Sequence, residues 1–421
     1  MEKIVIIGEE PLQGTIEISG SKNASLPLMA ASILTDETVV LKNIPNLADI
    51  HTMASVLESL GVNCNKSDLI NKNIIQLNYQ GSDKALAEYD LVRKMRASIL
   101  VLGPLLARKR KATVSMPGGC AIGGRAGKIH VDGVAKLGGE FNLEKGYIKC
   151  EAKSGLKGAK IELPMISVGA TENIIMAASL AKGETEISNI ATEPEIIDLI
   201  DCLKSMGAQI EVQSDRKVLI QGVESLNGTT HSVIPDRIEA GTYIIAGLIT
   251  KGELQIKNVN FDHIANLLSV FENLELNITR ENNNLIVKES SVSKNISLDT
   301  KEYPGFPTDL QAQIMVLLSL SKNASTIREN IFENRFMHVP ELNRMGADIN
   351  INGSQATINP CNGFSGAQVM ATDLRASVSL VLASLIAKGE TTINRVYHLD
   401  RGYENLENKL AGCGANIKRI Q

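Results

Sequence analysis

The chain has 421 residues and a formal net charge of −4, and 43% of its residues are hydrophobic. One hydrophobic core rarely grows beyond about 300 residues, so this length predicts two domains of roughly 200 residues each. The near balance of acidic and basic residues argues against nucleic acid or a membrane surface as a partner, and no uncharged stretch is long enough to span a bilayer. We therefore expect a soluble, cytoplasmic protein in which any anionic ligand is held by local charge.

Neither the cysteines nor the histidines form a recognisable ligand pattern. The six cysteines are spread along the chain without paired spacing, and the six histidines lack the spacing of metal ligands. Reduced thiols of this kind are typical of a cytosolic protein. We expect no metal, no other cofactor and no disulfide framework.

One sequence unit recurs six times along the chain, at intervals of roughly 70 residues. Each copy has an apolar helix of small residues, a short strand, an amphipathic helix and a further strand. The apolar helices start near residues 23, 96, 171, 239, 309 and 373, and the second copy is the least regular. A helix that is apolar on nearly every face must be enclosed by other elements. The pattern predicts an α/β fold with three such helices inside each domain and with strands and amphipathic helices around them.

The ends of the amphipathic helices also repeat. Glycines at positions 61, 207, 346 and 414 each precede an alternating strand, and we expect them to cap these helices at their C-termini.

Charged residues gather at the starts of the apolar helices. The acidic residues Asp236 and Asp373 are typical helix N-caps. The basic residues Lys22, Arg96 and Arg375 oppose the helix dipole, which indicates that a bound anion compensates them; solvated surface charge is the alternative. The exposed N–H groups of helix N-termini can bind such an anion.

Residues 116–125 read Met-Pro-Gly-Gly-Cys-Ala-Ile-Gly-Gly-Arg. Glycines let the backbone bend and approach a ligand closely, and no bulky neighbour within the segment could bury Cys120. The positive charge of Arg125 can shift the thiol's pKa, and its guanidinium can bind a phosphate or carboxylate through two hydrogen bonds. We interpret Cys120 as a thiol held for chemistry; a hydrophobic cysteine in a hinge loop is the alternative.

The motifs together resemble those of UDP-N-acetylglucosamine enolpyruvyl transferases, in order and over the whole chain. They are Gly20-Ser-Lys22-Asn23-Ala, Met95-Arg96-Ala-Ser, Pro117-Gly-Gly-Cys120, Ser167-Val-Gly-Ala-Thr-Glu, Phe306-Pro-Thr-Asp309, Phe332-Glu-Asn-Arg335, Ala371-Thr-Asp373-Leu-Arg375 and Asp400-Arg401-Gly-Tyr-Glu. The resemblance implies a two-domain enolpyruvyl transferase fold, an inside-out α/β barrel with three βαβαββ-type repeats in each domain and parallel buried helices. It implies one domain of residues 22–234, a second of residues 1–21 and 235–421, and an active site in the cleft between them.

The resemblance also implies the chemistry. Enzymes of this family move the enolpyruvyl group of phosphoenolpyruvate to the 3′-hydroxyl of UDP-N-acetylglucosamine and release phosphate. Cys120 would protonate the methylene carbon and would be alkylated by fosfomycin-like epoxides, while Asp309 would take the hydroxyl proton. Lys22, Arg125 and Arg401 would hold phosphoenolpyruvate, with Lys22 and Arg401 counted among the catalytic residues.

The substrate-binding residues implied for the UDP-sugar and the surrounding site form a larger set. They are Asn23, Arg96, Ser167, Val168, Gly169, Asp309 and Ile331 along the UDP-sugar, with Arg335, Asp373 and Arg375 as supporting charges. The expected role is the first committed step of peptidoglycan synthesis, and with it cell-wall biogenesis, cell shape and cell division. Since both halves of the chain supply residues, we expect domain closure to complete the site, with the Cys120 loop as its lid.

One segment departs from the family pattern. Where the family usually has Pro, then Val or Ile, then Asp after the loop arginine, this chain has Ala126, Gly127 and Lys128. We hypothesise that Lys128 approaches the diphosphate directly. Two alternatives remain open: the sister transferase that acts on shikimate phosphate but lacks the cysteine loop, and a non-catalytic paralogue that binds the UDP-sugar.

Overall fold

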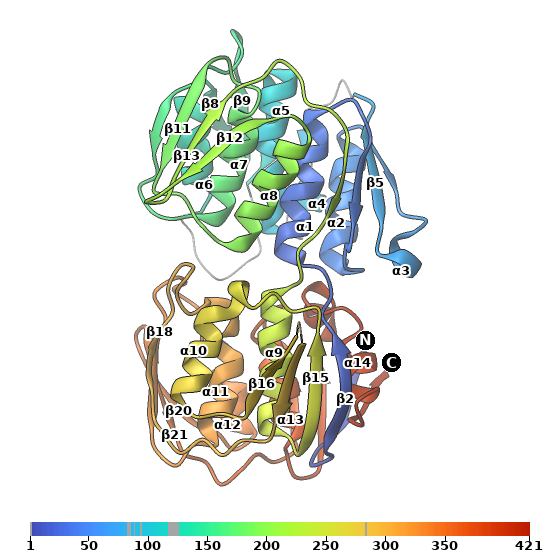
Figure 1. Ribbon diagram of the computed structural model, residues 1–421, viewed down its shortest axis with the longest axis vertical. Coiled ribbons are helices and arrows are strands. Elements are labelled where there is room, and N and C mark those ends of the chain that lie inside the picture. The colour runs from blue at the N-terminus through green and yellow to red at the C-terminus, as the bar shows by residue number, and fades with distance from the viewer. Residues whose placement is uncertain (1, 82–85, 88, 93–94, 117–125, 283) are drawn as a thin grey trace. The chain divides into compact units, whose positions relative to one another are not determined.

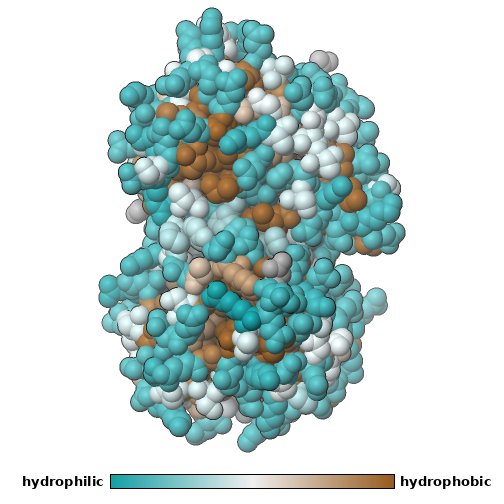
Figure 2. Space-filling model, in the orientation of Figure 1, coloured by the Kyte–Doolittle hydropathy of each residue, from teal (hydrophilic) through white to brown (hydrophobic). Residues whose placement is uncertain are grey.

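The computed structural model describes residues 2–81, 86–87, 89–92, 95–116, 126–282 and 284–421, with Arg96 and Ala126 described by their backbone only. The chain divides into two compact units: unit 1 comprises Met1–Ser19 and Pro235–Gln421, and unit 2 comprises Gly20–Ile234. Each unit has its own hydrophobic core. Figure 1 shows the elements of both, and hydrophilic residues dominate the face in Figure 2.

The described residues of unit 2 form three four-stranded sheets. Their strands, in spatial order, are β14 (Thr229–Ser232), β3 (Val39–Lys42), β5 (Ile75–Tyr79) and β4 (Val62–Asn65); β6 (Leu86–Ala87), β7 (Lys111–Ser115), β9 (Tyr147–Glu151) and β8 (Glu140–Glu144); and β10 (Lys160–Glu162), β11 (Glu184–Ser188), β13 (Lys217–Gln221) and β12 (Gln209–Gln213).

The part of unit 1 that the structure describes forms three further sheets of the same size. Their strands are β16 (Ile278–Glu281), β17 (Asn284–Lys288), β15 (Gly252–Lys257) and β2 (Leu12–Glu17); β18 (Ser297–Asp299), β19 (Ser325–Arg328), β21 (Gln355–Asn359) and β20 (Asp348–Asn352); and β22 (Gln368–Met370), β23 (Glu390–Asn394), β1 (Lys3–Ile7) and β24 (Asn416–Ile420).

All six sheets share one pairing pattern, which confirms the six repeats. In each sheet one edge strand pairs in parallel with its neighbour, and the other pairs are antiparallel. The N-terminal strands β1 and β2 pair with β23, β24 and β15 of the C-terminal half. Unit 1 is therefore built from both ends of the chain.

The apolar helices are buried on nearly every side, as their composition predicts. In unit 2 they are α1 (Lys22–Ala31), the 3₁₀ segment η2 (Arg96–Val101) with its continuation α5 (Leu102–Lys109), and α7 (Val168–Ala178). In unit 1 they are α9 (Arg237–Ile249), α11 (Gln311–Ser319) after the 3₁₀ turn η4 (Thr308–Leu310), and α13 (Ser377–Leu385). Every residue of α11 and α13 is buried.

The remaining helices are shorter or amphipathic. In unit 2 they are η1 (Ser32–Leu34), α2 (Ala48–Ser59), α3 (Leu69–Lys72), α4 (Tyr89–Val92), α6 (Ala126–Lys136) and α8 (Pro194–Ser205). In unit 1 they are η3 (Asp262–Ile264), α10 (Ala265–Asn273), α12 (Val339–Arg344), η5 (Val396–Arg401) and α14 (Leu406–Ala411). Gly61, Gly207, Gly346 and Gly414 all adopt positive φ angles of 92 to 107° after such helices, which confirms the expected C-caps.

The chain passes between the units at two adjacent points. The Ser21 N–H donates to the Ile234 carbonyl oxygen at 2.7 Å, and the Asp236 N–H donates to the Ser19 carbonyl oxygen at 2.9 Å. Gly20 lies between these bonds, where a Cβ atom would stand 1.7 Å from the Asn43 carbonyl oxygen. Only glycine fits this position. The two backbone bonds on either side of Gly20 pair the two crossing segments with each other.

Among the described residues, every helix is too short or too polar to traverse a lipid bilayer. Nor does this part of the chain bring together three or more side chains suited to hold a metal ion.

Candidate active site

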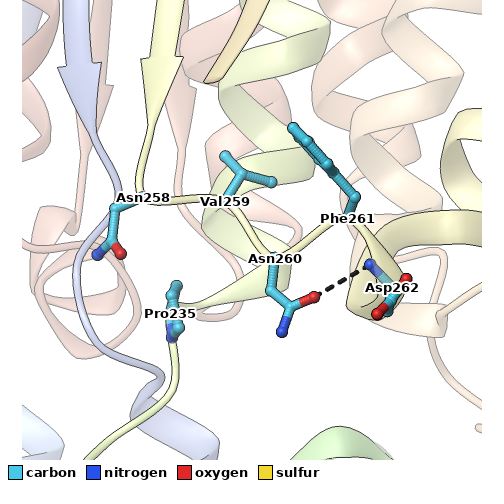
Figure 3. Close-up of a pocket in the computed structure, with 6 residues that line it drawn as sticks. All are labelled: Pro235, Asn258, Val259, Asn260, Phe261 and Asp262. Atoms are coloured by element: carbon cyan, nitrogen blue, oxygen red, sulfur yellow. Dashed lines mark hydrogen bonds between the residues drawn. The ribbon is translucent and has the colours of Figure 1, made fainter. Parts of the chain in front are cut away.

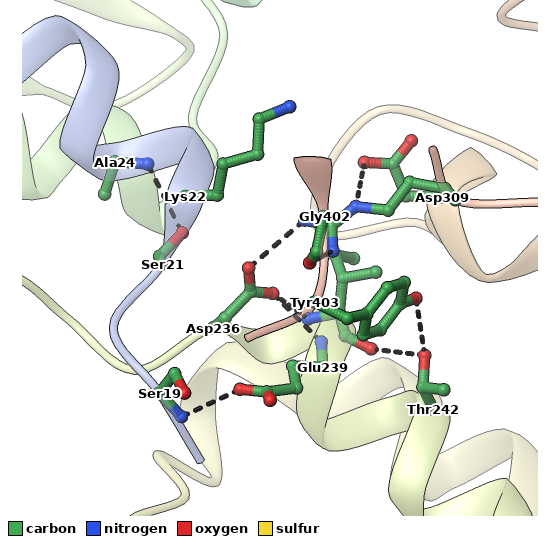
Figure 4. Close-up of polar contacts among 12 residues, drawn as sticks. Ser19, Ser21, Lys22, Ala24, Asp236, Glu239, Thr242, Asp309, Gly402 and Tyr403 are labelled. Atoms are coloured by element: carbon green, nitrogen blue, oxygen red, sulfur yellow. Dashed lines mark hydrogen bonds and ion pairs between the residues drawn. The ribbon is translucent and has the colours of Figure 1, made fainter. Parts of the chain in front are cut away.

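The first of the expected substrate-binding residues in unit 2, Lys22 and Asn23, lie at the start of helix α1. Ser21 caps this helix, since its hydroxyl accepts the Ala24 N–H at 3.3 Å (Figure 4). Lys22 and Asn23 therefore occupy the first turn. The Lys22 ammonium forms an ion pair of 2.9 Å with the Asp49 carboxylate, and the two side chains are only 8% and 3% exposed. A buried ammonium needs such a counter-charge.

Asp49 is a site residue that the sequence analysis missed. It lies in the first turn of α2, where an aspartate is ordinary. Only the folded chain shows that it compensates Lys22.

The turn at residues 167–169 also lies at a helix start. Ser167 caps α7, its hydroxyl accepting the Ala170 N–H at 3.4 Å, and Val168 and Gly169 form the first turn, where N–H groups have no intrahelical acceptor. A Cβ atom on Gly169 would lie 3.1 Å from Cε1 of His130 in α6. His130 of α6 is therefore close to the start of α7, and Lys128, two residues before His130, belongs to the first turn of α6.

Two expected residues of unit 2 fall outside the described residues: Cys120 and Arg125. Arg96 is the first residue of η2.

In unit 1 the expected base is held by two guanidinium groups. Asp309, in η4, accepts from Arg335 Nη2 at 2.7 Å and lies 3.6 Å from Arg375 Nε. The Arg335 and Arg375 side chains are 6% and 2% exposed, whereas that of Asp309 is 23% exposed. The carboxylate is therefore fixed from its buried side and remains accessible from the other.

The electrostatics follow from this grouping. Burial alone would lower the pKa of Arg335, but the charges of Asp309, Asp373 and Glu329 outweigh burial and raise it. The pKa of Arg375 is raised in the same way, against burial, mainly by Asp236. Both guanidinium groups stay charged.

Arg375 also holds the segment that carries Arg401. Its Nη2 donates to Asp236 Oδ2 at 3.1 Å and its Nη1 to the Gly402 carbonyl oxygen at 3.0 Å. Next to Gly402, the Tyr403 hydroxyl lies 2.9 Å from Thr242 Oγ1 (Figure 4). Arg401 is thus followed by two anchored residues. Burial, and then the charge of Arg401, lower the pKa of His398.

Asp236 caps α9, as its position predicts, whereas Asp373 binds the turn that precedes α13, a helix that begins only at Ser377. Asp236 Oδ1 accepts the N–H groups of Ile238 and Glu239 at 2.8 and 2.9 Å. Asp373 Oδ1 accepts those of Arg375 and Ala376, both at 2.8 Å. The sequence analysis expected a bound anion to compensate Lys22 and Arg375, whereas in this structure the protein's own carboxylates, Asp49 and Asp236, pair with them.

Ile331 is brought beside Asp309 by Glu329, a second residue that the sequence analysis missed. The Glu329 carboxylate accepts the Ile331 N–H at 2.9 Å and the Thr308 hydroxyl at 2.9 Å. Glu329 is 3% exposed, and it ties the turn at Ile331 to the residue before Asp309.

An open pocket of unit 1 lies elsewhere and is lined by Pro235, Asn258, Val259, Asn260, Phe261 and Asp262 (Figure 3). Its asparagines are engaged within the protein: Asn258 Nδ2 donates to the Ile18 carbonyl oxygen, and Asn260 Oδ1 accepts the Asp262 N–H. None of the expected site residues lines it.

Comparison with solved structures defines the class of protein. The fold is similar to the enolpyruvyl transferase NikO from Streptomyces tendae, with a TM-score of 0.90, 23% identity and coverage of 100% of this chain and 99% of the other. It is also similar to EPSP synthase from Acinetobacter baumannii, with a TM-score of 0.76, 16% identity and full coverage of both chains. The chain has the enolpyruvyl transferase fold.

Sequence comparison defines the family more closely. Residues 6–410 match the family described as EPSP synthase (3-phosphoshikimate 1-carboxyvinyltransferase). The chain is 52% identical, over the full length of both proteins, to relatives from Granulibacter bethesdensis and Pelagibacter ubique, each named UDP-N-acetylglucosamine 1-carboxyvinyltransferase. The chain belongs to the EPSP synthase family of enolpyruvyl transferases, in the group of the UDP-N-acetylglucosamine 1-carboxyvinyltransferases.

The ion pair of Lys22 and Asp49 makes a prediction about stability. Asp49→Asn leaves the Lys22 charge buried without its carboxylate, so the free energy of unfolding should fall by about 3 kcal/mol. Urea unfolding followed by circular dichroism measures this change. The control is Asp68→Asn, whose carboxylate pairs with Lys72 at a surface where the side chains are 37% and 63% exposed; it should cost less than about 1 kcal/mol. Equal effects of the two substitutions would contradict a buried ion pair at Lys22.

Proposed function

We propose that this chain transfers the enolpyruvyl group of phosphoenolpyruvate to the 3′-hydroxyl of UDP-N-acetylglucosamine and releases phosphate. The full-length relatives at 52% identity carry the name of this activity. The observation that carries the proposal is the partly exposed carboxylate of Asp309, held from behind by Arg335 and Arg375. A fixed carboxylate offers acceptor oxygens to a hydroxyl proton, and fixed geometry is what general base catalysis needs.

The proposed reaction is an addition followed by an elimination. The sugar oxygen bonds to C2 of phosphoenolpyruvate while its proton passes to Asp309, and Cys120 delivers a proton to C3. Loss of a proton from C3 and departure of phosphate then restore the double bond. Lys22, Arg125 and Arg401 are proposed to neutralise the phosphate and carboxylate of phosphoenolpyruvate.

Residues of both units are needed for this chemistry. Lys22, Cys120 and Arg125 belong to unit 2, whereas Asp309 and Arg401 belong to unit 1. We propose that the complete site forms in the cleft between them when the units close on the substrates, with the Cys120 segment as a lid.

The UDP-sugar is proposed to lie along Asn23, Arg96, the turn of Ser167, Val168 and Gly169, and Ile331, with Asp373 as a supporting charge. This reaction would be the first committed step of peptidoglycan synthesis, carried out in the cytoplasm, and would serve cell shape and division. The enzyme would be a target of fosfomycin.

The assay that tests the proposal measures phosphate released from phosphoenolpyruvate. UDP-N-acetylglucosamine should support release, and shikimate 3-phosphate, the substrate named for the matched family, should not. Release with shikimate 3-phosphate alone would assign the chain to the sister activity. If neither acceptor supports phosphate release, the proposal that the chain is an enzyme of this kind is contradicted.

Asp309→Asn removes the proposed proton acceptor but keeps the side chain's size. We expect kcat to fall by roughly 10² to 10⁴-fold, because an amide cannot take the hydroxyl proton. The KM for UDP-N-acetylglucosamine should change far less than kcat. The control is Asp299→Asn, at an exposed position of β18 in the same unit, with kcat within about two-fold of the parent. A kcat for Asp309→Asn as high as that of the control would rule Asp309 out as the base.

Cys120 should react with alkylating reagents faster than the other cysteines. Burial raises the pKa of every cysteine in the described part of the chain: to about 12 for Cys64 and Cys202, to about 11 for Cys150, and upward for Cys361 and Cys413. Because the thiolate is the reactive form, these five groups stay protonated and slow to react near pH 7. Limited alkylation by iodoacetamide, read by peptide mass spectrometry, should label Cys120 first.

Cys120→Ala is the matched variant for that experiment. It should abolish the fast labelling and the turnover while keeping UDP-sugar binding. Fast labelling that persists in Cys120→Ala would show that another thiol is the reactive one.

Lys128 is proposed to contact the diphosphate. His130, two residues after Lys128 in α6, lies beside Gly169 in the first turn of α7, and a cation near this place would meet an anion bound by the N–H groups of α7. Lys128→Ala should raise the KM for UDP-N-acetylglucosamine by roughly ten-fold and change kcat little. Lys136→Ala, in the last turn of the same helix, is the control. An unchanged KM for Lys128→Ala would show that Lys128 does not contact the diphosphate.

A further inference from the structure

The buried amide of Asn173 replaces a missing bond in the helix that starts at Arg96. This helix begins as the 3₁₀ segment η2 and becomes α-helical at Leu102. Asn173 Oδ1 accepts the Gly103 N–H at 2.6 Å, and Asn173 Nδ2 donates to the Ile99 carbonyl oxygen at 2.9 Å. In a continuous α-helix, Gly103 N–H and Ile99 C=O would bond to each other. The Asn173 side chain stands between them and satisfies both.

The sequence of the helix explains why it breaks here. Pro104 has no N–H and its ring would clash with the carbonyl group of Leu100 in a regular helix, and the residue before a proline disfavours the α conformation. Leu102 N–H bonds to Ile99 in the 3₁₀ manner instead. Gly103 lets α7 approach closely, since a Cβ atom there would stand 2.4 Å from Asn173 Oδ1. The break in the helix therefore leaves both the space that the Asn173 side chain occupies and the unpaired backbone groups that it bonds.

The same amide also fixes His130 of α6. Because the Gly103 N–H defines which atom of Asn173 is the oxygen, the second hydrogen of Nδ2 points to His130 Nδ1 at 3.0 Å. His130 Nδ1 is therefore the acceptor and the ring proton resides on Nε2. The ring packs between Asn173 and Gly169, one turn apart on α7. Asn173 is 0% exposed, and all its amide hydrogens are used.

These contacts join three helix starts. η2 begins at Arg96, α7 begins at the Ser167 turn, and α6 begins just before Lys128. A 3₁₀ segment rises about 2.0 Å per residue instead of 1.5 Å, so the three residues from Ile99 back to Arg96 place Arg96 roughly 1.5 Å farther from the Asn173 amide than an α-helix would. The bonds of Asn173 thus determine where Arg96 stands relative to the start of α7.

We propose that Asn173 is a positioning residue for the UDP-sugar: it holds the 3₁₀ segment in the geometry that presents Arg96 to this substrate beside the Ser167 turn. The inference rests on the proposed function, because Arg96 and that turn are the proposed ligands of the UDP-sugar. Asn173 itself touches no substrate. Its effect on binding passes through Arg96.

The test measures UDP-N-acetylglucosamine binding by calorimetry, without phosphoenolpyruvate, so that turnover is not involved. Asn173→Ala should weaken binding by about ten-fold or more, because a displacement of about 1 Å is costly at a preorganised site. In a chain that already carries Arg96→Ala, the same substitution should weaken binding by less than about two-fold. This coupling is a result that a merely structural role would not give.

The control is Ser179→Ala, which removes a buried hydroxyl from the other end of α7 and should leave the Kd within about two-fold. If Asn173→Ala fails to fold, Asn173→Ser, which retains one small polar group, is measured in its place with the same expectation. Unchanged binding in the Asn173 variant, or a loss of equal size with and without Arg96, would overturn the inference. Failure of the unmodified chain to bind UDP-N-acetylglucosamine would instead contradict the proposed function.

Discussion

The buried charge of Arg375 is the constraint on which the candidate site in unit 1 depends. A guanidinium that is 2% exposed is tolerated only where carboxylates and carbonyl oxygens surround it. Asp236, Asp309 and the Gly402 carbonyl oxygen meet this need. The three partners come from separate parts of the chain: the start of α9 after the second crossing, the 3₁₀ turn before α11, and the segment after η5. One side chain therefore makes an ion pair with the proposed base and a hydrogen bond to the residue next to Arg401.

The same principle recurs at other helix starts. Lys22 at α1 pairs with Asp49, and Lys409 pairs with Glu239 of α9 at 2.7 Å. Glu239 in turn accepts the Ser19 N–H at 2.8 Å (Figure 4). Lys22, which opposes the dipole of its own helix, and Lys409, which lies in the last turn of α14, are thus both stabilised by internal carboxylates before any substrate is bound. An arriving phosphate would meet cations that are already oriented, and preorganised charge is the main source of transition-state stabilisation in such sites.

The fold was largely predictable from the sequence, because its signals are periodic and local. The six repeats, the enclosed helices and the glycine C-caps each follow from spacing within a few residues. The site was predictable only in part. Lys22, Asp309 and Arg375 stand out because they occur in specific motifs, and Arg375 and Asp309 do meet. Asp49, Glu329 and Asn173 did not stand out, since an acid in a first turn or an amide inside a helix looks ordinary. Their partners lie far along the chain: Asn173 reaches Gly103, 70 positions away. No local pattern reports such pairs.

The central claim is that Arg375 holds Asp309 and the Gly402 segment in place at the same time. The most direct measurement is kcat for phosphate release in Arg375→Lys, with circular dichroism to confirm that the chain is folded. Lysine keeps the positive charge but lacks the planar guanidinium that bonds Asp236 and the Gly402 carbonyl oxygen while its Nε lies 3.6 Å from Asp309. The account predicts that kcat falls by about 100-fold, since the base is no longer held in its reactive geometry. A folded Arg375→Lys chain with kcat within about two-fold of the parent would contradict it.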